Sequence, residues 1–185
     1  MRMPPSKAEK ASRRRSAQDA RCVSGDHPEG TLRHHLVNLL SKEQAHAGFS
    51  RAVADFPVHL RGMKIAGSPH TPWQLLEHLR IAQWDILEFC RNSRHVSPPF
   101  PKGYWPPTQE PPDAAAWERS VHAFHADLDA MIALVKSPRT DLFARIPGGE
   151  SQTILREAML VADHNAYHLG QFILLRRLAG SWEAG

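Results

Sequence analysis

The chain has 185 residues and a formal net charge of +4; 42% of its residues are hydrophobic and 23% are charged. This composition is typical of one globular domain and excludes a wholly disordered or collagen-like chain. No apolar run approaches the roughly 18 residues of a membrane span, so we expect no membrane insertion. Only two cysteines, Cys22 and Cys90, are present, which excludes a disulfide scaffold or a cysteine-rich zinc module.

The positive excess lies in the first 28 residues, which contain seven basic and three acidic side chains. We therefore predict a disordered basic tail over residues 1–28 and one folded domain over residues 29–185. The tail lacks the apolar segment of a secretory signal, so the sequence predicts a cytoplasmic protein with reduced cysteines. The basic charge of this tail is the only feature of the sequence that indicates binding to an acidic partner or to RNA. The folded part has balanced charge, so we expect it to bind no nucleic acid.

The first predicted helix covers residues 31–55 and ends before Pro57. Its apolar residues recur at mostly helical spacing: Leu32, Leu36, Leu39, Leu40 and Phe49. The second predicted helix covers residues 71–90, with Thr71 as its N-cap and Pro72 at its first helical position.

Seven prolines between Asn92 and Pro112 exclude an α-helix or a central strand from that segment. This connection is longer than most connections between helices of a bundle. It contains Phe100, Tyr104 and Trp105. We therefore expect it to pack against the body of the domain, as a long crossover or as a lid.

The third predicted helix covers residues 113–135, with Asp113 as a candidate cap, and the fourth covers residues 151–178. Ser151 is the candidate N-cap of the fourth helix, and Gly180 ends it. No segment alternates strictly between apolar and polar residues, so we expect no strands. The predicted fold is all-α: an antiparallel four-helix bundle with a long proline-rich connection between its second and third helices.

Among twelve histidines, His164 and His168 form the most informative pair. They are four residues apart on the fourth predicted helix, so both rings project from one face. This spacing allows both imidazoles to bind one metal ion at about 2.0–2.1 Å. A third ligand has to come from another helix, where His78 is the best candidate and the others are His34, His35, His122 and His125. The alternative is that all of them are surface or hydrogen-bonded histidines.

Several polar residues share the faces of these histidines and are candidate hydrogen-bond partners for them: Gln74 and Asp85, and Glu157 and Gln171. Tyr167 points about 100° away from His168 on a helix, so it is assigned no role. Cys90 lies in the middle of a predicted helix without a neighbouring base and is interpreted as a core residue. The HExxH, P-loop, GxGxxG and GxSxG motifs are absent.

The run Ala162-Asp-His-Asn-Ala-Tyr-His-Leu-Gly-Gln171 contains HxxxH and then Gly-Gln. It resembles the last helix of the DinB/YfiT-like metalloprotein superfamily, the damage-inducible family, in which HxxxH is followed by Gly-Gln. The run Thr71-Pro-Trp-Gln-Leu-Leu-Glu-His-Leu79 resembles its second helix, which carries a single histidine. The resemblance covers residues 31–182 but gives no counterpart for the tail or the proline-rich insertion.

The resemblance implies a DinB-like four-helix bundle in which His78, His164 and His168 bind one divalent metal ion. The metals it implies are zinc or nickel, with iron or manganese as alternatives. Members of the family often form dimers, so it also implies a homodimer. Characterised relatives transfer bacillithiol or glutathione to electrophiles, or isomerise maleylpyruvate with mycothiol. The resemblance therefore implies a small-molecule substrate and a low-molecular-weight thiol, although no residue here is assigned to thiol recognition.

Three protein ligands leave coordination positions open, which is the pattern of catalytic metal sites. A metal with an open position lowers the pKa of bound water toward about 7 or holds a thiol as thiolate. Our leading hypothesis is therefore a metal-dependent enzyme, a thiol S-transferase that acts on small electrophiles. A metal-dependent hydrolase at the same site and a non-catalytic metal-binding or interaction module are the alternatives.

Overall fold

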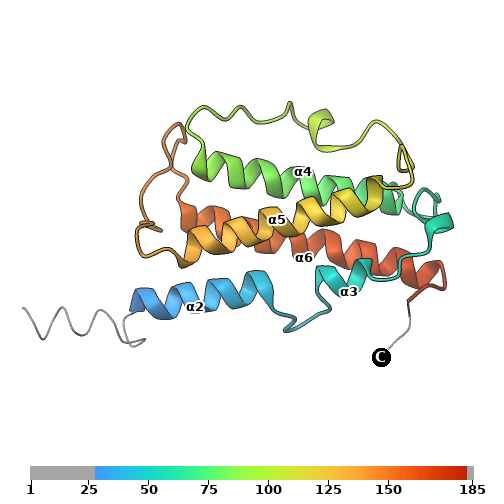
Figure 1. Cartoon of the computed structure of the whole chain (residues 1–185), viewed down its shortest axis with the longest axis horizontal. Helices are drawn as coiled ribbons and strands as arrows, with labels where there is room; N and C mark the ends of the chain where they lie inside the picture. The colour runs from blue at the N-terminus through green and yellow to red at the C-terminus, as the bar shows by residue number, and fades with distance from the viewer. Residues whose placement is uncertain (1–27, 183–185) are drawn as a thin grey trace, which may run out of the picture.

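The structure is a computed structural model, which describes residues 28–182. These residues form five α-helices and no strand: α2 Pro28–Ser41, α3 Phe49–Val53, α4 Pro72–Arg91, α5 Ala116–Lys136 and α6 Ile154–Leu178 (Figure 1). Two short 3-10 turns, η1 Val58–Leu60 and η2 Lys102–Tyr104, lie in the connections. The all-α fold class is confirmed. Residues 1–27 of the predicted tail lie outside the described part of the chain, and Pro28 begins α2.

The prediction of one continuous first helix is wrong, because α2 ends at Ser41 and α3 begins only at Phe49. The residues between them, 42–48, include no large apolar side chain that packing would hold in a helix. Glu43 Oε1 instead accepts a hydrogen bond of 2.8 Å from the backbone N–H of Gly48, the N-cap of α3. The side chain thereby supplies a partner to a donor that a continuous helix would have satisfied with its backbone.

The predicted start of α4 is confirmed in detail. Thr71 and Gln74 form a capping box in which each side chain accepts a hydrogen bond from the backbone N–H of the other residue, at 3.2 and 3.0 Å. The Thr71 hydroxyl also donates to the Gln109 carbonyl oxygen at 2.6 Å. The cap therefore connects the start of α4 to the far end of the proline-rich segment.

The other two long helices begin later than the sequence predicts. α5 begins at Ala116, and Asp113 accepts a hydrogen bond from the Ala115 N–H at 2.9 Å ahead of the helix. α6 begins at Ile154, and Thr153 is its N-cap. Thr153 also pairs with Arg145 in an isolated antiparallel bridge, so the residues before it are not helical. The predicted cap Ser151 therefore lies outside the helix.

The long helices pack in pairs: α4 contacts α5 and α6, and α2 contacts the same two helices. Figure 1 shows these four helices lying alongside one another, with the connection between α4 and α5 running back along α4. Three hydrogen bonds hold this connection in place. Tyr104 donates to Asp85 of α4, Thr108 accepts from Trp73 at the start of α4, and Gln109 accepts from the N-cap Thr71. The proline-rich segment therefore packs against the body, as predicted.

The core consists of two apolar clusters at different levels of the helices. One is centred on Trp117 and Phe172, and the other contains Leu87, Met131 and Val135. On α6 the residues between Val161, which belongs to the second cluster, and Leu169, which belongs to the first, include both histidines of the HxxxH pair.

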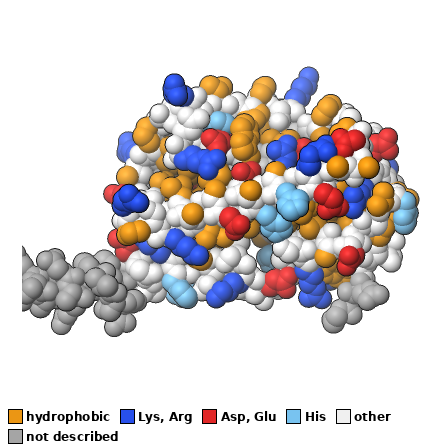
Figure 2. Space-filling model, in the orientation of Figure 1, with side chains coloured by type: hydrophobic (Ala, Val, Ile, Leu, Met, Phe, Trp, Pro, Cys, Tyr) orange, Lys and Arg blue, Asp and Glu red, His pale blue; other side chains and the backbone are white. Residues whose placement is uncertain are grey.

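No helix within residues 28–182 is long and apolar enough to cross a membrane. On the face of the molecule shown in Figure 2, lysine and arginine side chains are interspersed with aspartate and glutamate side chains. The described part of this face therefore carries mixed charge.

Candidate metal centre

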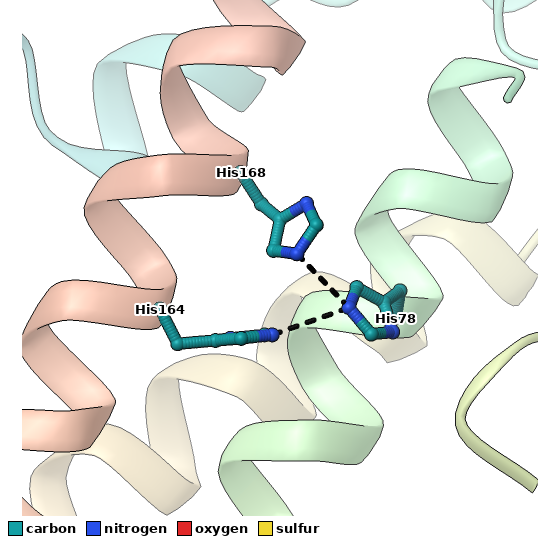
Figure 3. Close-up of side chains that lie close together, drawn as sticks. All are labelled: His78, His164 and His168. Carbon is teal, nitrogen blue, oxygen red and sulfur yellow. Dashed lines mark hydrogen bonds between the residues drawn. The ribbon is translucent and has the colours of Figure 1, made fainter. Parts of the chain in front are cut away.

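Three histidine side chains from two neighbouring helices converge on one point (Figure 3). His164 Nε2 lies 3.2 Å and His168 Nε2 lies 3.1 Å from His78 Nε2. The ring nitrogens that the three residues can offer to a metal ion all lie within 4.8 Å of one another. The structure thus brings together the three histidines that the sequence singles out, and this cluster could hold a metal ion.

The orientation of His78 is fixed by the segment that runs back along α4. Its Nδ1 donates a hydrogen bond of 2.9 Å to the carbonyl oxygen of Tyr104. The indole of Trp105 stacks on the His78 ring, with centroids 4.0 Å apart and planes inclined by 2°. The ring is therefore held both at its edge and on its face, and its Nε2 points toward the other two histidines.

A buried carboxylate holds Tyr104 in turn. Asp85, two turns along α4 from His78, accepts a hydrogen bond of 2.6 Å from the Tyr104 hydroxyl. The other carboxylate oxygen of Asp85 lies 2.6 Å from His95 Nε2. Burial, followed by the hydrogen bond to Asp85, raises the pKa of Tyr104 to about 12, so the phenol remains a donor at neutral pH. Asp85 thus acts on His78 through Tyr104.

The two histidines of α6 have different surroundings. His168 Nδ1 lies 3.2 Å from Gln171 Oε1, one turn further along the same helix. His164 Nδ1 is buried and has no hydrogen-bond partner among the described residues. The neighbouring Asn165 side chain donates to Gln83 at 2.8 Å, away from the cluster. Of the polar neighbours that the sequence proposes, Gln171 and Asp85 therefore act in the site.

The hydrogen bonds indicate which nitrogen of each ring carries the proton. A carbonyl oxygen only accepts, so His78 Nδ1 is protonated and its Nε2 presents a lone pair. The same reasoning applied to Gln171 Oε1 leaves a lone pair on His168 Nε2. Two lone pairs 3.1 Å apart repel unless a cation lies between them. Two nitrogens bound tetrahedrally to zinc lie about 3.3 Å apart, so the donor set fits a divalent metal ion.

The electrostatics of the cluster favour neutral imidazoles. Burial, and to a smaller extent the neighbouring histidines, lower the pKa of His164 and of His168 to about 4. Burial also lowers the pKa of His78, although the Tyr104 carbonyl partly opposes this change. Because metal binding requires neutral imidazoles, all three rings are in the correct protonation state at neutral pH.

The other candidate ligands lie away from this cluster. His34 and His35 are exposed on α2, where His34 pairs with Asn38, and His122 is exposed on α5. His125 lies 3.4 Å from the Ser50 hydroxyl. These histidines behave as surface residues.

The surroundings of Glu157 and Cys90 indicate that both side chains have a structural role. Glu157 is buried and pairs with Arg156 at 2.6 Å. Cys90 packs against the second core cluster, and burial raises the pKa of its thiol to about 12. The interpretation of Cys90 as an unreactive core cysteine agrees with these observations.

Sequence reasoning missed three aromatic residues beside the cluster. Trp105 covers His78, His70 stacks on the opposite face of Trp105 at 3.8 Å, and Tyr167 meets the His168 ring edge-on at 4.8 Å. The aromatic residues in the proline-rich segment are a signal that it packs on something. However, nothing in the spacing shows that the surface it covers includes His78.

Comparison with known protein families identifies the family of this chain. The DinB superfamily matches over residues 29–172, a range that includes all three clustered histidines and the segment that orients His78. Neither the curated proteins nor the solved structures gave a match to this chain. The family match covers most of the described residues and agrees with their all-helical fold. The chain therefore belongs to the DinB superfamily.

Proposed function

We propose that this protein is a metal-dependent enzyme that uses His78, His164 and His168 as ligands of one divalent metal ion and transfers a small thiol to an electrophile. The observation that carries the proposal is the convergence of three imidazoles, and no fourth protein ligand, within 4.8 Å among the described residues. Three histidine ligands leave a coordination position open for a reactant, as in catalytic sites.

A divalent metal bound there supplies Lewis acidity, which lowers the pKa of a thiol or a water molecule and provides a nucleophile at neutral pH. The chain contributes orientation: the Tyr104 carbonyl and the Trp105 ring hold His78, and Gln171 holds His168. Both sets of contacts direct Nε2 lone pairs to one point. The donor set suits zinc or nickel, with iron and manganese as alternatives, because imidazole binds all of these metals.

The proposal extends to the setting of the enzyme. We infer an antiparallel four-helix bundle for the long helices, a homodimeric assembly, a small-molecule substrate and a cytoplasmic location. The absence of membrane-spanning helices among the described residues and the mixed charge of the visible face are compatible with this setting. Neither nucleic acid nor a membrane is proposed as a partner of the domain.

The first test is elemental analysis of protein purified without an affinity tag. We expect about one divalent metal ion per chain in the wild type and none in a variant with His78, His164 and His168 replaced by alanine. A matched control replaces His34, His35 and His122, which are exposed, and should retain the metal. Metal-free wild-type protein, even after incubation with zinc, nickel, iron and manganese, would disprove the site.

The second test separates the chemistries. The metal-loaded protein is assayed with a panel of small electrophiles, with and without glutathione, bacillithiol or mycothiol. Turnover that requires a thiol and disappears in the triple-alanine variant supports the transferase. Turnover without a thiol indicates a hydrolase instead. A loaded protein with no turnover in either series, whose fold depends on the metal, indicates a non-catalytic module.

A further inference from the structure

A cavity of about 380 Å³ adjoins the histidine cluster. His168 belongs to both, since its ring lines the cavity and its Nε2 faces His78. Trp105 is also shared, because one face of its indole covers His78 and its side chain lines the cavity. A molecule in this cavity would therefore contact His168, one of the three proposed metal ligands.

The lining of this cavity contains no aspartate, glutamate, lysine or arginine. Four leucines line it, one from α4 and three from α6: Leu75, Leu174, Leu175 and Leu178. A second cavity of about 420 Å³ has charged residues in its lining, namely Lys42, Glu43 and Asp129. None of the three clustered histidines lines this second cavity. The cavity next to the cluster is thus the uncharged one, and binding an ion there without a partner would carry a large desolvation penalty.

Three apolar side chains at the cavity are exposed to solvent: Tyr167, Leu174 and Leu178. Contiguous exposed apolar side chains beside a cavity are typical of a ligand-binding site. Polar groups are available in addition, because the imidazole of His70 and the hydroxyl of Tyr167 belong to lining residues and make no hydrogen bond with another described residue. A ligand could therefore bury an apolar body and still make a hydrogen bond.

We propose that this cavity binds the electrophilic substrate, and that this substrate is an uncharged small molecule with an apolar, ring-sized body. This inference rests on the proposed function and names its substrate class. The thiols considered above carry several charged groups, which the cavity lining cannot pair. The cavity therefore selects the electrophile, and the thiol approaches the metal from outside it.

A cation lies close to the cavity: Lys64 Nζ donates a hydrogen bond to the carbonyl oxygen of Pro69, a residue of the lining. Its charge also contributes to lowering the pKa of His70, after burial. A negatively charged substrate could use this lysine. The test therefore compares an uncharged probe with an anionic one.

The probes are three hydroxamates, which chelate divalent metal ions through two oxygen atoms: acetohydroxamate, benzohydroxamate and 4-carboxybenzohydroxamate. Their affinities are measured calorimetrically on the zinc-loaded full chain. We expect benzohydroxamate to bind about tenfold more tightly than acetohydroxamate, because its ring buries apolar surface in the cavity. We expect the added carboxylate to abolish this gain.

Two matched variants locate the effect. Leu174 lines the cavity and is 52% exposed, whereas Met159 lies on the same helix, is 46% exposed and lines none of the cavities described above. Leu174→Asp should remove the advantage of benzohydroxamate and leave acetohydroxamate binding unchanged. Met159→Asp, with the same change of charge, should preserve both affinities.

Each other outcome overturns the inference. Equal affinities for the three probes, on protein that carries zinc, would show that the cavity binds no substrate body while the metal site stands. Tighter binding of the carboxylate would assign the cavity to anions held by Lys64. If the chain takes up no metal, the proposed function fails. The cavity is then tested on metal-free protein with the fluorine NMR signal of 4-fluorobenzamide. Broadening of this signal by the wild type, but not by Leu174→Asp, would show that the cavity binds an apolar ring.

Discussion

At the scale of single residues, the hydrogen bonds that lead from Asp85 to His78 make a specific demand on Tyr104. Its hydroxyl is held by Asp85, and its carbonyl oxygen holds His78 Nδ1. Groups that orient a histidine ligand contribute substantially to metal affinity, and their loss typically weakens it about 10–100-fold. Because only the carbonyl touches His78, the phenol acts by placing the backbone.

We therefore expect Tyr104→Phe to weaken zinc binding by about tenfold while the helical circular dichroism is unchanged. Asp85→Asn should have a similar effect, because it weakens the same hydrogen bond. The measurement is competition with a chelating dye. Tyr167→Phe is the matched control, since Tyr167 is the only other tyrosine and its hydroxyl makes no hydrogen bond with another described residue. Equal zinc affinity in the Tyr104→Phe and Tyr167→Phe variants would show that Tyr104 does not position His78.

At the scale of elements, the N-terminus of α4 depends on Thr71. The side chain is fully buried, caps the helix and also donates to the Gln109 carbonyl oxygen. Thr71→Ala removes both the helix cap and the hydrogen bond to the Gln109 carbonyl oxygen, so we expect a loss of about 2 kcal/mol of unfolding free energy in urea. Thr71→Ser should retain most of it. A loss no larger than that of Thr153→Ala, a cap without the second bond, would contradict this account.

A second element-scale contact joins α3 to α6 through Arg176. Its guanidinium is buried and donates to the carbonyl oxygens of Ala52 and Ala54, each at 2.8 Å, and to Ser181 at 2.7 Å. We expect Arg176→Met to lower the unfolding free energy by about 2–4 kcal/mol, because it leaves these acceptors unpaired. Arg177→Met, at the exposed neighbouring position, should change it by less than about 0.5 kcal/mol. Equal effects of the two substitutions would refute the interpretation.

At the scale of the whole molecule, the buried histidines link stability to pH. In metal-free protein the pKa of His164 and of His168 is about 4, against 6.5 in the unfolded chain. Between these two pKa values the unfolded chain binds more protons than the folded chain does. The free energy of unfolding therefore has its full value above pH 6.5 and decreases as the pH falls toward 4. Urea unfolding with a chelator, at pH 7.5 and at pH 5, measures this loss.

The matched variant for this measurement carries glutamine at both positions of the HxxxH pair. Its difference in stability between the two pH values should be smaller than that of the wild type, because two groups with lowered pKa values are gone. Identical differences in the two proteins would mean that other groups cause the acid sensitivity.

Metal binding should act on the same molecule in the opposite direction. A metal that binds only the folded chain stabilises it by mass action, so zinc should raise the melting temperature of the wild type. The rise should diminish at pH 5, where protons compete for the ligands. The triple-alanine variant should show no rise at either pH. A rise in that variant would place the zinc elsewhere.

The sequence predicted the existence of the long helices well and their ends less well. Thr71 marks the start of α4 correctly because its cap is completed by Gln74, three residues along the chain. The predicted first helix includes residues 42–48, which are not helical in the structure, and there the Glu43 side chain accepts a hydrogen bond from the Gly48 N–H. Helical spacing predicts that Met159 lies on the apolar face of α6, yet it is 46% exposed. Periodicity describes one helix, whereas exposure depends on where the neighbouring helices end.

The sequence by itself determined the all-α fold class and the pairing of His164 with His168. Both depend on information that is local in the chain: apolar spacing, caps, and a four-residue interval that places His164 and His168 on one face. His78 was one of several candidates for the third ligand by spacing, and the family resemblance implied it. Tertiary structure alone decided that Trp105, Tyr104 and Asp85 hold His78, and that an uncharged cavity adjoins His168. These contacts join residues distant in the chain, and they exist only because the proline-rich segment runs back along α4.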